Sequence, residues 1–373
     1  MENSAPQSQG QSEPVAKPQT DQNNPNDVMD LQKLLQTAVK YKASDIYISV
    51  GIKPSLRIHG KIIPIQQHPI LSKTMAEKYI GEIMNEKQKQ DFSKTLDIDF
   101  AINIKGLSRF RVNVFMQSKG IGAVLRIIEQ DIKSIDELNL PSQLKKLANL
   151  KQGIVLITGP TGQGKSTTLA AIINEINATK EHNIITIEDP IEFLHPNKKS
   201  IIQQREVGKH TKNYQSALKG VLREAADVIL VGEMRDAETI SLALTAAETG
   251  HLVLSTLHTS GAAKTVDRII DTFSSDQQNQ IRNQLSESLQ AVVWQQLLPL
   301  ADDKGRTAGL EIMLKNSAIS NLIREGKTFQ IKSVLETNQA EGMQTMQSAI
   351  EKLHSQGFIT EKTKDDYNFG LSI

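Results

Sequence analysis

Apolar and polar positions change their pattern along the chain, and each change marks a segment. Residues 1–27 consist mainly of Gln, Ser, Pro, Asn, Asp and Lys. Such a composition buries too little apolar surface to offset the entropy of ordering, so we expect a disordered tail. A helix is predicted from about Asp27, because one face carries apolar residues at helical spacing: Leu31, Leu34, Leu35 and Val39.

Short alternating runs surround one helical stretch between residues 28 and 130. The runs DIYISVG, LRIHGKIIPI, DIDFAIN, SRFRVNVF and GAVLRII predict strands, and SKTMAEKYIGEIMNEKQKQDF predicts one helix. The pairs His59-Gly60 and Lys105-Gly106 are predicted hairpin turns. This pattern favours a small α+β domain with a mainly antiparallel sheet. The polar residues 131–150 are interpreted as an interdomain linker.

Residues 151–373 follow a different pattern. The apolar runs GIVLITG, NIITIED, DVILVGE and HLVLSTLH alternate with helical segments, which is typical of a parallel sheet covered on both faces. From about residue 262 onward the pattern is interpreted as helical, with DQQNQIRNQLSESLQAVVWQQLL as one helix. The predicted fold class is α/β, preceded by the smaller α+β domain and ending in a helical region.

Composition excludes several classes of protein. The net charge is +1 and only 4% of residues are aromatic, which argues against the basic grooves and stacking platforms of nucleic-acid translocases. The absence of cysteine excludes disulfides and thiolate metal sites. We expect no signal peptide and no transmembrane segment, since no apolar run approaches the roughly 20 residues that span a bilayer. A cytoplasmic location is expected.

The strongest motif is GPTGQGKS, which matches G-x-x-x-x-G-K-[ST] between an apolar strand and a predicted helix. Glycines let backbone N–H groups wrap around phosphates, Lys165 adds a positive charge, and the Ser166 hydroxyl can bind Mg²⁺. A glycine-rich turn without a ligand is the alternative, which the strand and helix context disfavours. The predicted nucleotide-binding residues are Gly159, Pro160, Thr161, Gly162, Gln163, Gly164, Lys165, Ser166 and Thr167.

Carboxylates follow the second strand of this domain. Glu188 and Asp189 end the strand, Pro190 blocks further pairing, and Glu192 comes shortly after. Ligands of open α/β sheets bind at the carboxyl edge of the strands. Each acid is therefore a candidate for orienting water or holding the metal, and a solvated acidic turn is the alternative.

The stretch DVILVGEMRD carries an acid at each end of its strand. An extension of six residues at about 3.3 Å each separates Asp227 from Glu233 by roughly 20 Å, so they cannot share one metal ion. Glu233 leaves the strand at the phosphate edge and is predicted to face the nucleotide. Asp227 is interpreted as a capping or solubilising residue.

Two histidines flank the next strand. His251 precedes it and His258 follows it, and about 23 Å of strand makes binding of one metal by both implausible. Either can be a structural histidine. His258 is the stronger functional candidate because it leaves the strand at the phosphate edge, where an imidazole can sense the γ-phosphate or a neighbouring acid.

Arginines on predicted strands of the first domain are candidates for action on a neighbouring subunit. In SRFRVNVF, Arg109 and Arg111 alternate with apolar residues, and Arg126 lies in the next strand. Arginines on adjacent strands can hold a phosphate bidentately or stabilise charge in phosphoryl transfer. An ordinary solvated face is the alternative.

The ordered set GPTGQGKSTT, TIEDPIEF, VILVGEMRDAETISLALTAAETGHLVLSTLHT and KTVDRIID resembles the type II/IV secretion ATPase superfamily. The resemblance is strongest to its pilus retraction ATPases, the PilT family, and covers nearly the whole chain from about residue 28. It implies a hexameric ring of subunits with a PAS-like N-terminal domain and a RecA-like P-loop ATPase domain. It also implies hydrolysis of ATP, with Mg²⁺, to ADP and phosphate, driving pilin filament disassembly in twitching motility.

The resemblance assigns roles by position. Lys165 and Ser166 are the Walker A residues, Glu192 is the water-activating carboxylate, and Glu233 is the atypical Walker B acid. His251 and His258 match the histidine box, and Arg111 and Arg126 match the inter-subunit arginines. The expected partners are further copies of the chain, a platform protein at the cytoplasmic face of the inner membrane, and a paralogous retraction ATPase. No nucleic-acid partner is expected.

The chain departs from the family pattern in two motifs. Members commonly have LREDPDV before the Walker B strand, whereas this chain has LREAADV, with Ala225 and Ala226. The retraction motif AIRNLIRE appears as AISNLIRE, with Ser320 in place of arginine. The matching motif residues are Ala318, Ile319, Asn321, Leu322, Ile323, Arg324 and Glu325.

These departures leave an alternative function open. The primary hypothesis is a motor that hydrolyses ATP and retracts pili. The alternative is an accessory retraction ATPase subunit that binds nucleotide but depends on a partner motor. A RecA-like core driving nucleic-acid translocation is a third hypothesis, weakened by the charge and aromatic content.

Overall fold

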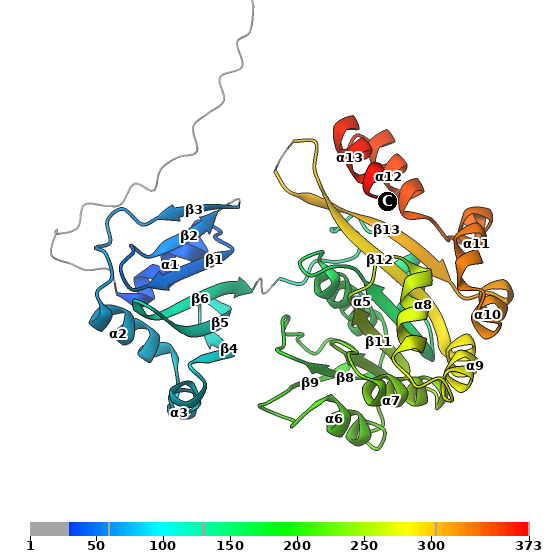
Figure 1. Ribbon diagram of the computed structural model, residues 1–373, viewed down its shortest axis with the longest axis horizontal. Coiled ribbons are helices and arrows are strands. Elements are labelled where there is room, and N and C mark those ends of the chain that lie inside the picture. The colour runs from blue at the N-terminus through cyan, green and yellow to red at the C-terminus, as the bar shows by residue number, and fades with distance from the viewer. Residues whose placement is uncertain (1–29, 59, 129–130, 303, 372–373) are drawn as a thin grey trace, which may run out of the picture. The chain divides into compact units, whose positions relative to one another are not determined.

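The computed structural model describes residues 30–58, 60–128, 131–302 and 304–371. The predicted tail therefore lies outside the described residues. The chain divides into two compact units, one formed by residues up to Ile102 with Val112–Ile127, the other by Asn103–Arg111 with Ile128–Ile373. Figure 1 shows the elements of both units.

A six-stranded sheet of order β3-β2-β1-β6-β5-β4 forms the centre of the first unit. The pairs β1–β2, β1–β6 and β2–β3 are antiparallel, as predicted. The predicted Lys105-Gly106 turn joins β4 to β5 with Gly106 at φ 77°, and His59 lies outside the described residues. The strands are β1 Asp45–Ser49, β2 Ser55–Ile58, β3 Lys61–Pro64, β4 Asp97–Ile104, β5 Ser108–Gln117 and β6 Gly120–Ile128.

Helices of the first unit are α1 Leu31–Lys40, α2 Lys73–Ile83 and α3 Glu86–Thr95. The prediction of one helix across SKTMAEKYIGEIMNEKQKQDF is wrong. Met84 adopts an extended conformation, and Asn85 begins a new helix by accepting a hydrogen bond from the backbone N–H of Gln88. The Gln88 side chain accepts from the Asn85 backbone in return, and this capping box fixes the break.

The second unit contains a seven-stranded sheet of order β13-β12-β7-β11-β10-β8-β9. Pairing between neighbours from β12 to β9 is parallel, and β12–β13 is antiparallel. The strands are β7 Gly153–Thr158, β8 Asn183–Glu188, β9 Ile201–Glu206, β10 Val228–Val231, β11 Leu252–Leu257, β12 Leu289–Pro299 and β13 Arg306–Leu314. The short, largely polar edge strand β9 was not predicted.

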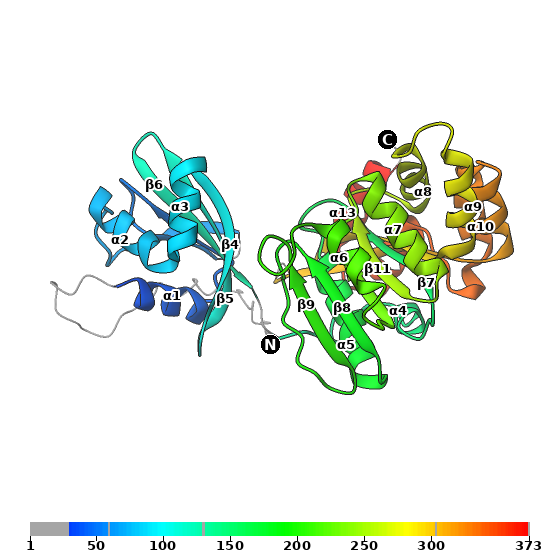
Figure 2. The same ribbon diagram turned by 90° about the horizontal axis from the view of Figure 1, so that it is seen from below.

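Both faces of this sheet are covered by helices, as predicted (Figure 2). Because side chains alternate along a strand, Ile154 and Leu156 of β7 pack in the core that includes α6 Tyr214–Val221 and α7 Ala237–Glu248. Val155 and Ile157 pack in the opposite core, with α5 Lys165–Thr179. The sheet is therefore held rigidly between two apolar layers.

The segment from residue 262 onward is not wholly helical. It begins with α8 Ala262–Asp271 and α9 Gln278–Ser288, but the predicted continuation of α9 is the strand β12. β12 pairs with β7 on one side and β13 on the other, so its backbone groups are satisfied by partners distant in sequence. The remaining helices are α10 Ser317–Arg324, α11 Ile331–Thr337, α12 Met346–Ser355 and α13 Glu361–Leu371.

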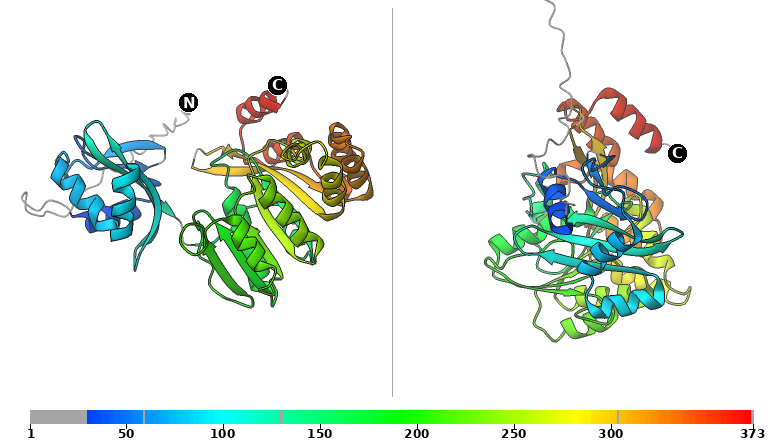
Figure 3. Two further views of the ribbon diagram at one scale, coloured as in Figure 1. Left: turned by 60° about the horizontal axis from the view of Figure 1, so that its bottom comes forward. Right: turned by 90° about the vertical axis from the view of Figure 1, so that its left-hand side faces the viewer.

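Helices α12 and α13 lie beside the β12–β13 hairpin (Figures 1 and 3). A small core of Trp294 and Leu298 from β12 with Met346, Ile350 and Ile359 joins them. The hairpin thus connects β7 to the C-terminal helices. No described helix is long and apolar enough to cross a membrane.

Residues 131–150 form part of the second unit's core and not a free linker. Ile135 and Leu144 are fully buried, and the short helix α4 Gln143–Leu147 packs against α5. These side chains join the core that contains Val155 and Ile157. The segment was interpreted as a linker because most of its residues are polar, but its few apolar residues pack in this core.

Candidate active site

The parallel strands β7, β8, β10 and β11 end at one edge of the sheet, where the predicted functional residues gather. The loop Gly159–Gly164 follows β7, the acids Glu188–Glu192 follow β8, Glu233 follows β10 and His258 follows β11. The predicted residues therefore lie at the carboxyl edge of the parallel strands, as expected from the sequence.

Glycine is required at the ends of the phosphate loop. Gly159 has φ 140°, and a Cβ there would lie 2.4 Å from the backbone oxygen of Gln295. Gly164 has φ 77° and stands directly before α5, where no side chain caps the helix. The loop thus presents bare backbone and a helix N-terminus, the arrangement that binds phosphate through N–H groups and the helix dipole.

The Lys165 side chain reaches back to the phosphate loop that precedes it in the sequence. Its Nζ donates to the carbonyl oxygens of Gly159, at 2.7 Å, and Pro160, at 3.0 Å. Burial lowers the Lys165 pKa, and the charges of Glu233 and Glu192 act against that shift. Lysine and both carboxylates therefore share one electrostatic environment, although they follow three different strands.

Glu233 is held by a histidine and an arginine. Its Oε1 lies 3.3 Å from His258 Nε2, and its Oε2 lies 2.7 Å from Arg235 Nη2. Burial alone would raise the Glu233 pKa, but the hydrogen bond and charge of Arg235, with His258 and Lys165, outweigh it and lower the pKa. Glu233 is therefore a carboxylate at neutral pH, in a form able to act on a metal ion through water.

The three acids after β8 have different environments. Glu188 accepts hydrogen bonds from the Thr186 hydroxyl and the Gln204 amide, and burial raises its pKa. Asp189 is exposed and precedes a cis bond to Pro190. Glu192 is half-buried, and its backbone N–H lies 3.4 Å from Glu188 Oε2. Glu188 thus supports the turn, whereas Glu192 acts electrostatically on Lys165.

Asp227 and His251 lie at the opposite ends of the strands from the phosphate loop. Asp227 accepts a hydrogen bond from the backbone N–H of Asn183, at 2.8 Å, where β8 begins. His251 Nδ1 lies 2.9 Å from the carbonyl oxygen of Ala246, before β11. Ala225 shares this end of the sheet, with φ 49°. The change from the family's LREDPDV therefore lies away from the phosphate edge.

Sequence reasoning missed Tyr214, the first residue of α6. Its hydroxyl lies 3.2 Å from the position that a Cβ on Gly232 would take. Burial raises its pKa, and the negative charges of Asp189 and Glu233 add to the shift. The only local signal was a tyrosine at a helix start, after Asn213, which caps α6.

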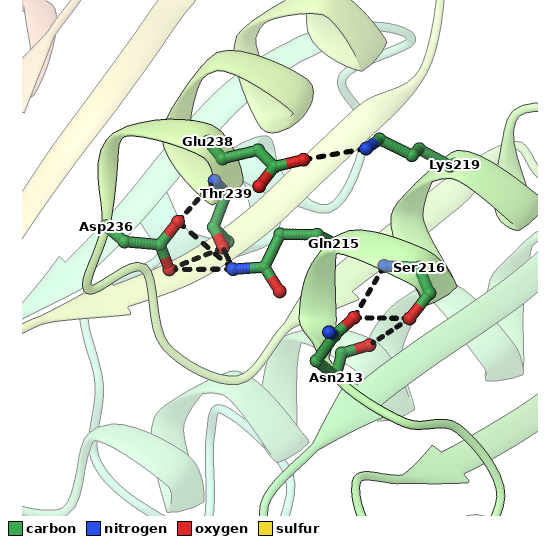
Figure 4. A network of polar contacts seen from close by, with 7 residues as sticks. All are labelled: Asn213, Gln215, Ser216, Lys219, Asp236, Glu238 and Thr239. Atoms are coloured by element: carbon green, nitrogen blue, oxygen red, sulfur yellow. Dashed lines mark hydrogen bonds and ion pairs between the residues drawn. The ribbon is translucent and has the colours of Figure 1, made fainter.

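A polar network joins α6 to the loop that carries Glu233 (Figure 4). Gln215 Nε2 donates to both carboxylate oxygens of Asp236, at 3.1 Å, and Asp236 caps α7 through the backbone N–H of Thr239. Lys219 of α6 also pairs with Glu238 of α7 at 2.7 Å. These contacts fix the segment that follows Glu233 and Arg235.

The two predicted inter-subunit arginines lie on neighbouring strands, β5 and β6. Arg126 Nε lies 2.9 Å from Asp45 Oδ1, and the Arg126 side chain remains 67% exposed. Arg111 is half-buried on β5. Phe110, which alternates with it, is fully buried, in agreement with the predicted alternation of faces.

The AISNLIRE segment forms α10 and its C-cap, Glu325. Ile319 and Ile323 are buried against the rest of the second unit, and Ser320 and Leu322 are half-buried. The exposed members of the motif are Ala318, Asn321, Arg324 and Glu325. The buried pair packs the helix against the core, whereas the exposed residues are available to other molecules.

The residues at the sheet edge fit a nucleotide with a divalent cation. Cβ atoms at Gly159 and Gly164 would obstruct the loop, Lys165 supplies positive charge, and Ser166 lies in the first turn of α5 and is only half-buried. The ionised Glu233 provides the oxygen ligand chemistry that Mg²⁺ prefers. This set can hold the β- and γ-phosphates and position water for attack on the terminal phosphorus.

The fold and this site define a P-loop ATPase with a RecA-like nucleotide domain. The model of the family described as Type II/IV secretion system protein matches residues 21–349. The chain belongs to this family.

Two curated relatives and one solved structure place the chain within the family. It is 46% identical over 346 residues to "Type IV pilus retractation ATPase PilT" of Pseudomonas aeruginosa, covering 91% of this chain and 100% of the relative. It is 50% identical to "Twitching motility protein" of Neisseria gonorrhoeae, covering 87% of each. The structure titled "Crystal Structure of the Pilus Retraction Motor PilT and Bound ADP" has a TM-score of 0.84 and 44% identity, covering 90% of this chain and 96% of that one.

Proposed function

We propose that this chain is a motor that hydrolyses ATP to retract pili, acting as a hexameric ring. The observation that carries the proposal is the likeness to a pilus retraction motor over nine-tenths of both chains. The sheet edge supports it chemically, because a phosphate loop, a paired carboxylate and a second carboxylate converge there. ATP hydrolysis at this edge would supply the energy for filament disassembly.

Each residue at the edge has a role in the proposed reaction. Lys165 would bind the phosphates, Ser166 would hold Mg²⁺, and Glu233 would hold the ion through water. Mg²⁺ would neutralise charge on the phosphate oxygens. Glu192 orients the attacking water, because it is half-buried, acts on Lys165, and is free of the hydrogen bonds that occupy Glu188.

Arg111 and Arg126 are proposed to act on the nucleotide of a neighbouring subunit. Arg126 is mostly exposed and bound to Asp45 through Nε, at 2.9 Å. Its terminal nitrogens can therefore still form the bidentate contact that a phosphate requires. This role makes each site depend on ring assembly and would couple hydrolysis between subunits.

The proposed motor works at the cytoplasmic face of the inner membrane, against a platform protein of the pilus. The exposed residues of α10, Asn321 and Arg324 among them, are the proposed contact for transmitting force. A paralogous retraction ATPase is a further proposed partner. The likeness to pilus retraction proteins supports the proposal of these partners.

Pilus number in cells distinguishes the possible roles. Cells that lack the protein should carry more and longer surface pili and lose twitching, and the wild-type gene should restore both. Bald cells would instead indicate a role in extension and refute the proposal. A second assay distinguishes the motor from the accessory alternative. The purified protein is assayed alone for phosphate release, and absence of turnover would favour an accessory subunit that depends on a partner motor.

A further inference from the structure

The phosphate loop is bonded to a strand far from it in sequence. Gln295 of β12 is 2% exposed, and its side-chain amide lies between two parts of the loop region. Its Oε1 accepts a hydrogen bond from the Thr168 hydroxyl, at 2.6 Å, and its Nε2 donates to the carbonyl oxygen of Gln163, also at 2.6 Å. One amide therefore connects the loop to the first turn of α5.

Two backbone contacts from the same strand act on the same loop. The backbone N–H of Leu297 donates to Gln163 Oε1 at 2.6 Å. At the other end of the loop, Gly159 approaches the backbone oxygen of Gln295 so closely that a Cβ would lie 2.4 Å from it. Gln295 and Leu297 thus contact the loop between them, at both of its ends.

We propose that Gln295 is a positioning residue of the nucleotide site, which sets the orientation of the loop's N–H groups before ATP binds. The peptide between Gln163 and Gly164 is planar and trans, so its C=O and N–H point in opposite directions. Because Nε2 of Gln295 holds the carbonyl towards β12, the Gly164 N–H points away from β12. A loop fixed in this way loses less conformational freedom when phosphate binds.

Glutamine suits this position because one side chain must both donate and accept. The Gln163 carbonyl requires a donor, and the Thr168 hydroxyl requires an acceptor. A carboxylate could not donate to the carbonyl, and an apolar side chain of the same length would leave both groups unpaired. The amide thus ties the loop to a hairpin that also carries the C-terminal helices.

The inference predicts weaker nucleotide binding with little change in the chemical step. A preorganised loop stabilises the bound substrate and the transition state equally. Loss of this order therefore raises KM and Kd and leaves kcat unchanged. Loss of the two hydrogen bonds of Gln295 should weaken binding about tenfold. A residue that only supported the fold would lower the melting temperature and leave KM unchanged.

Gln295→Met removes both hydrogen bonds at nearly constant volume, and Gln296→Met is the matched control. Gln296 is its neighbour on β12, half-buried and opposite Gly309. Calorimetric titration with ADP and steady-state ATP turnover should give an about tenfold increase in Kd and KM for Gln295→Met. The control should match the wild type. Equal Kd and KM in wild type and Gln295→Met would overturn the inference.

Thr168 gives a second test that leaves β12 unchanged. Thr168→Val removes the hydroxyl that donates to Gln295, and Thr168→Ser retains it. Valine should raise the Kd for ADP severalfold and serine should restore it, whereas equal binding by both would contradict the inference. The inference rests on ATP binding at this loop. Failure of the wild type to bind any nucleotide would refute that site, whereas equal binding by wild type and variants refutes only the role of Gln295.

Discussion

His258 connects the two charged groups of the phosphate site. Its Nε2 lies 3.3 Å from Glu233 Oε1, and its Nδ1 lies 3.5 Å from Lys165 Nζ. Lysine only donates and an ionised glutamate only accepts. The ring thus lies between the donor Lys165 and the acceptor Glu233, within 3.5 Å of both.

Removal of this connection should lower ATP turnover. His258→Ala leaves Glu233 with Arg235 alone, so the carboxylate can move away from the nucleotide. We expect kcat to fall between about tenfold and a hundredfold, because Glu233 loses one of its two polar side-chain partners. The measurement is steady-state phosphate release.

The matched control is His182→Ala. His182 lies at the opposite end of the sheet, 3.8 Å from Asp227, and is only half-buried. Its replacement should leave turnover within about twofold of the wild type, as for most substitutions away from a site. Equal losses in the two variants would contradict the role of His258.

The location of the site was predictable from the sequence because each motif follows its own strand. The motif GPTGQGKS is local, and parallel strands end at one edge whichever way they are ordered. The separation of Asp227 from Glu233 needed only the length of β10. The resemblance singled out Glu192, but the different environments of Glu188 and Glu192 were not predictable from the residues themselves. The environment of Glu188 depends on Thr186 and Gln204, and Gln204 lies on the unpredicted strand β9.

The strand β12 and the contact of Gln295 with the loop could not be obtained from local periodicity. Helix α9 ends at Ser288 and β12 begins at Leu289, with no glycine or proline between them. Apolar residues continue through the junction, and only pairing with β7 and β13 determines the strand. Val292 and Val293, followed by the turn residues DDKG, were the available signal.

The buried and exposed faces of α10 should give separate phenotypes. Ile323→Ala deletes a side chain that is 1% exposed and should lower the free energy of unfolding by about 2–5 kcal/mol. Arg324→Ala should change stability by less than about 0.5 kcal/mol and leave ATP turnover intact, but abolish pilus retraction. Urea unfolding, phosphate release and twitching assays measure the three effects.

An exposed residue of the next helix provides the control for Arg324. Glu336→Ala on α11 alters a charge on the same part of the unit and should retain retraction. Twitching by the Arg324→Ala cells at the wild-type rate would show that α10's exposed face does not transmit force.

Glu311 should make stability depend on pH. Burial raises its pKa, although the backbone N–H of Ala262 donates to Oε1 at 2.8 Å. The folded state therefore binds a proton more tightly than the unfolded chain, whose glutamate pKa is about 4.3. This contribution to stability is complete below that pH and is lost as pH rises through the folded pKa.

The Glu311→Gln variant removes that titration. Urea unfolding at a series of pH values should show the wild type losing stability relative to Glu311→Gln as pH rises from about 4. A constant difference between the two proteins across this range would contradict the prediction.

The central claim is that the carboxylates at this sheet edge promote ATP hydrolysis. ATP turnover by Glu192→Gln tests this claim most directly. The purified wild type should release phosphate, and Glu192→Gln should still bind ATP while its kcat falls by about a hundredfold or more, because the attacking water loses its base. Turnover by Glu192→Gln at the wild-type rate would contradict the account of the site.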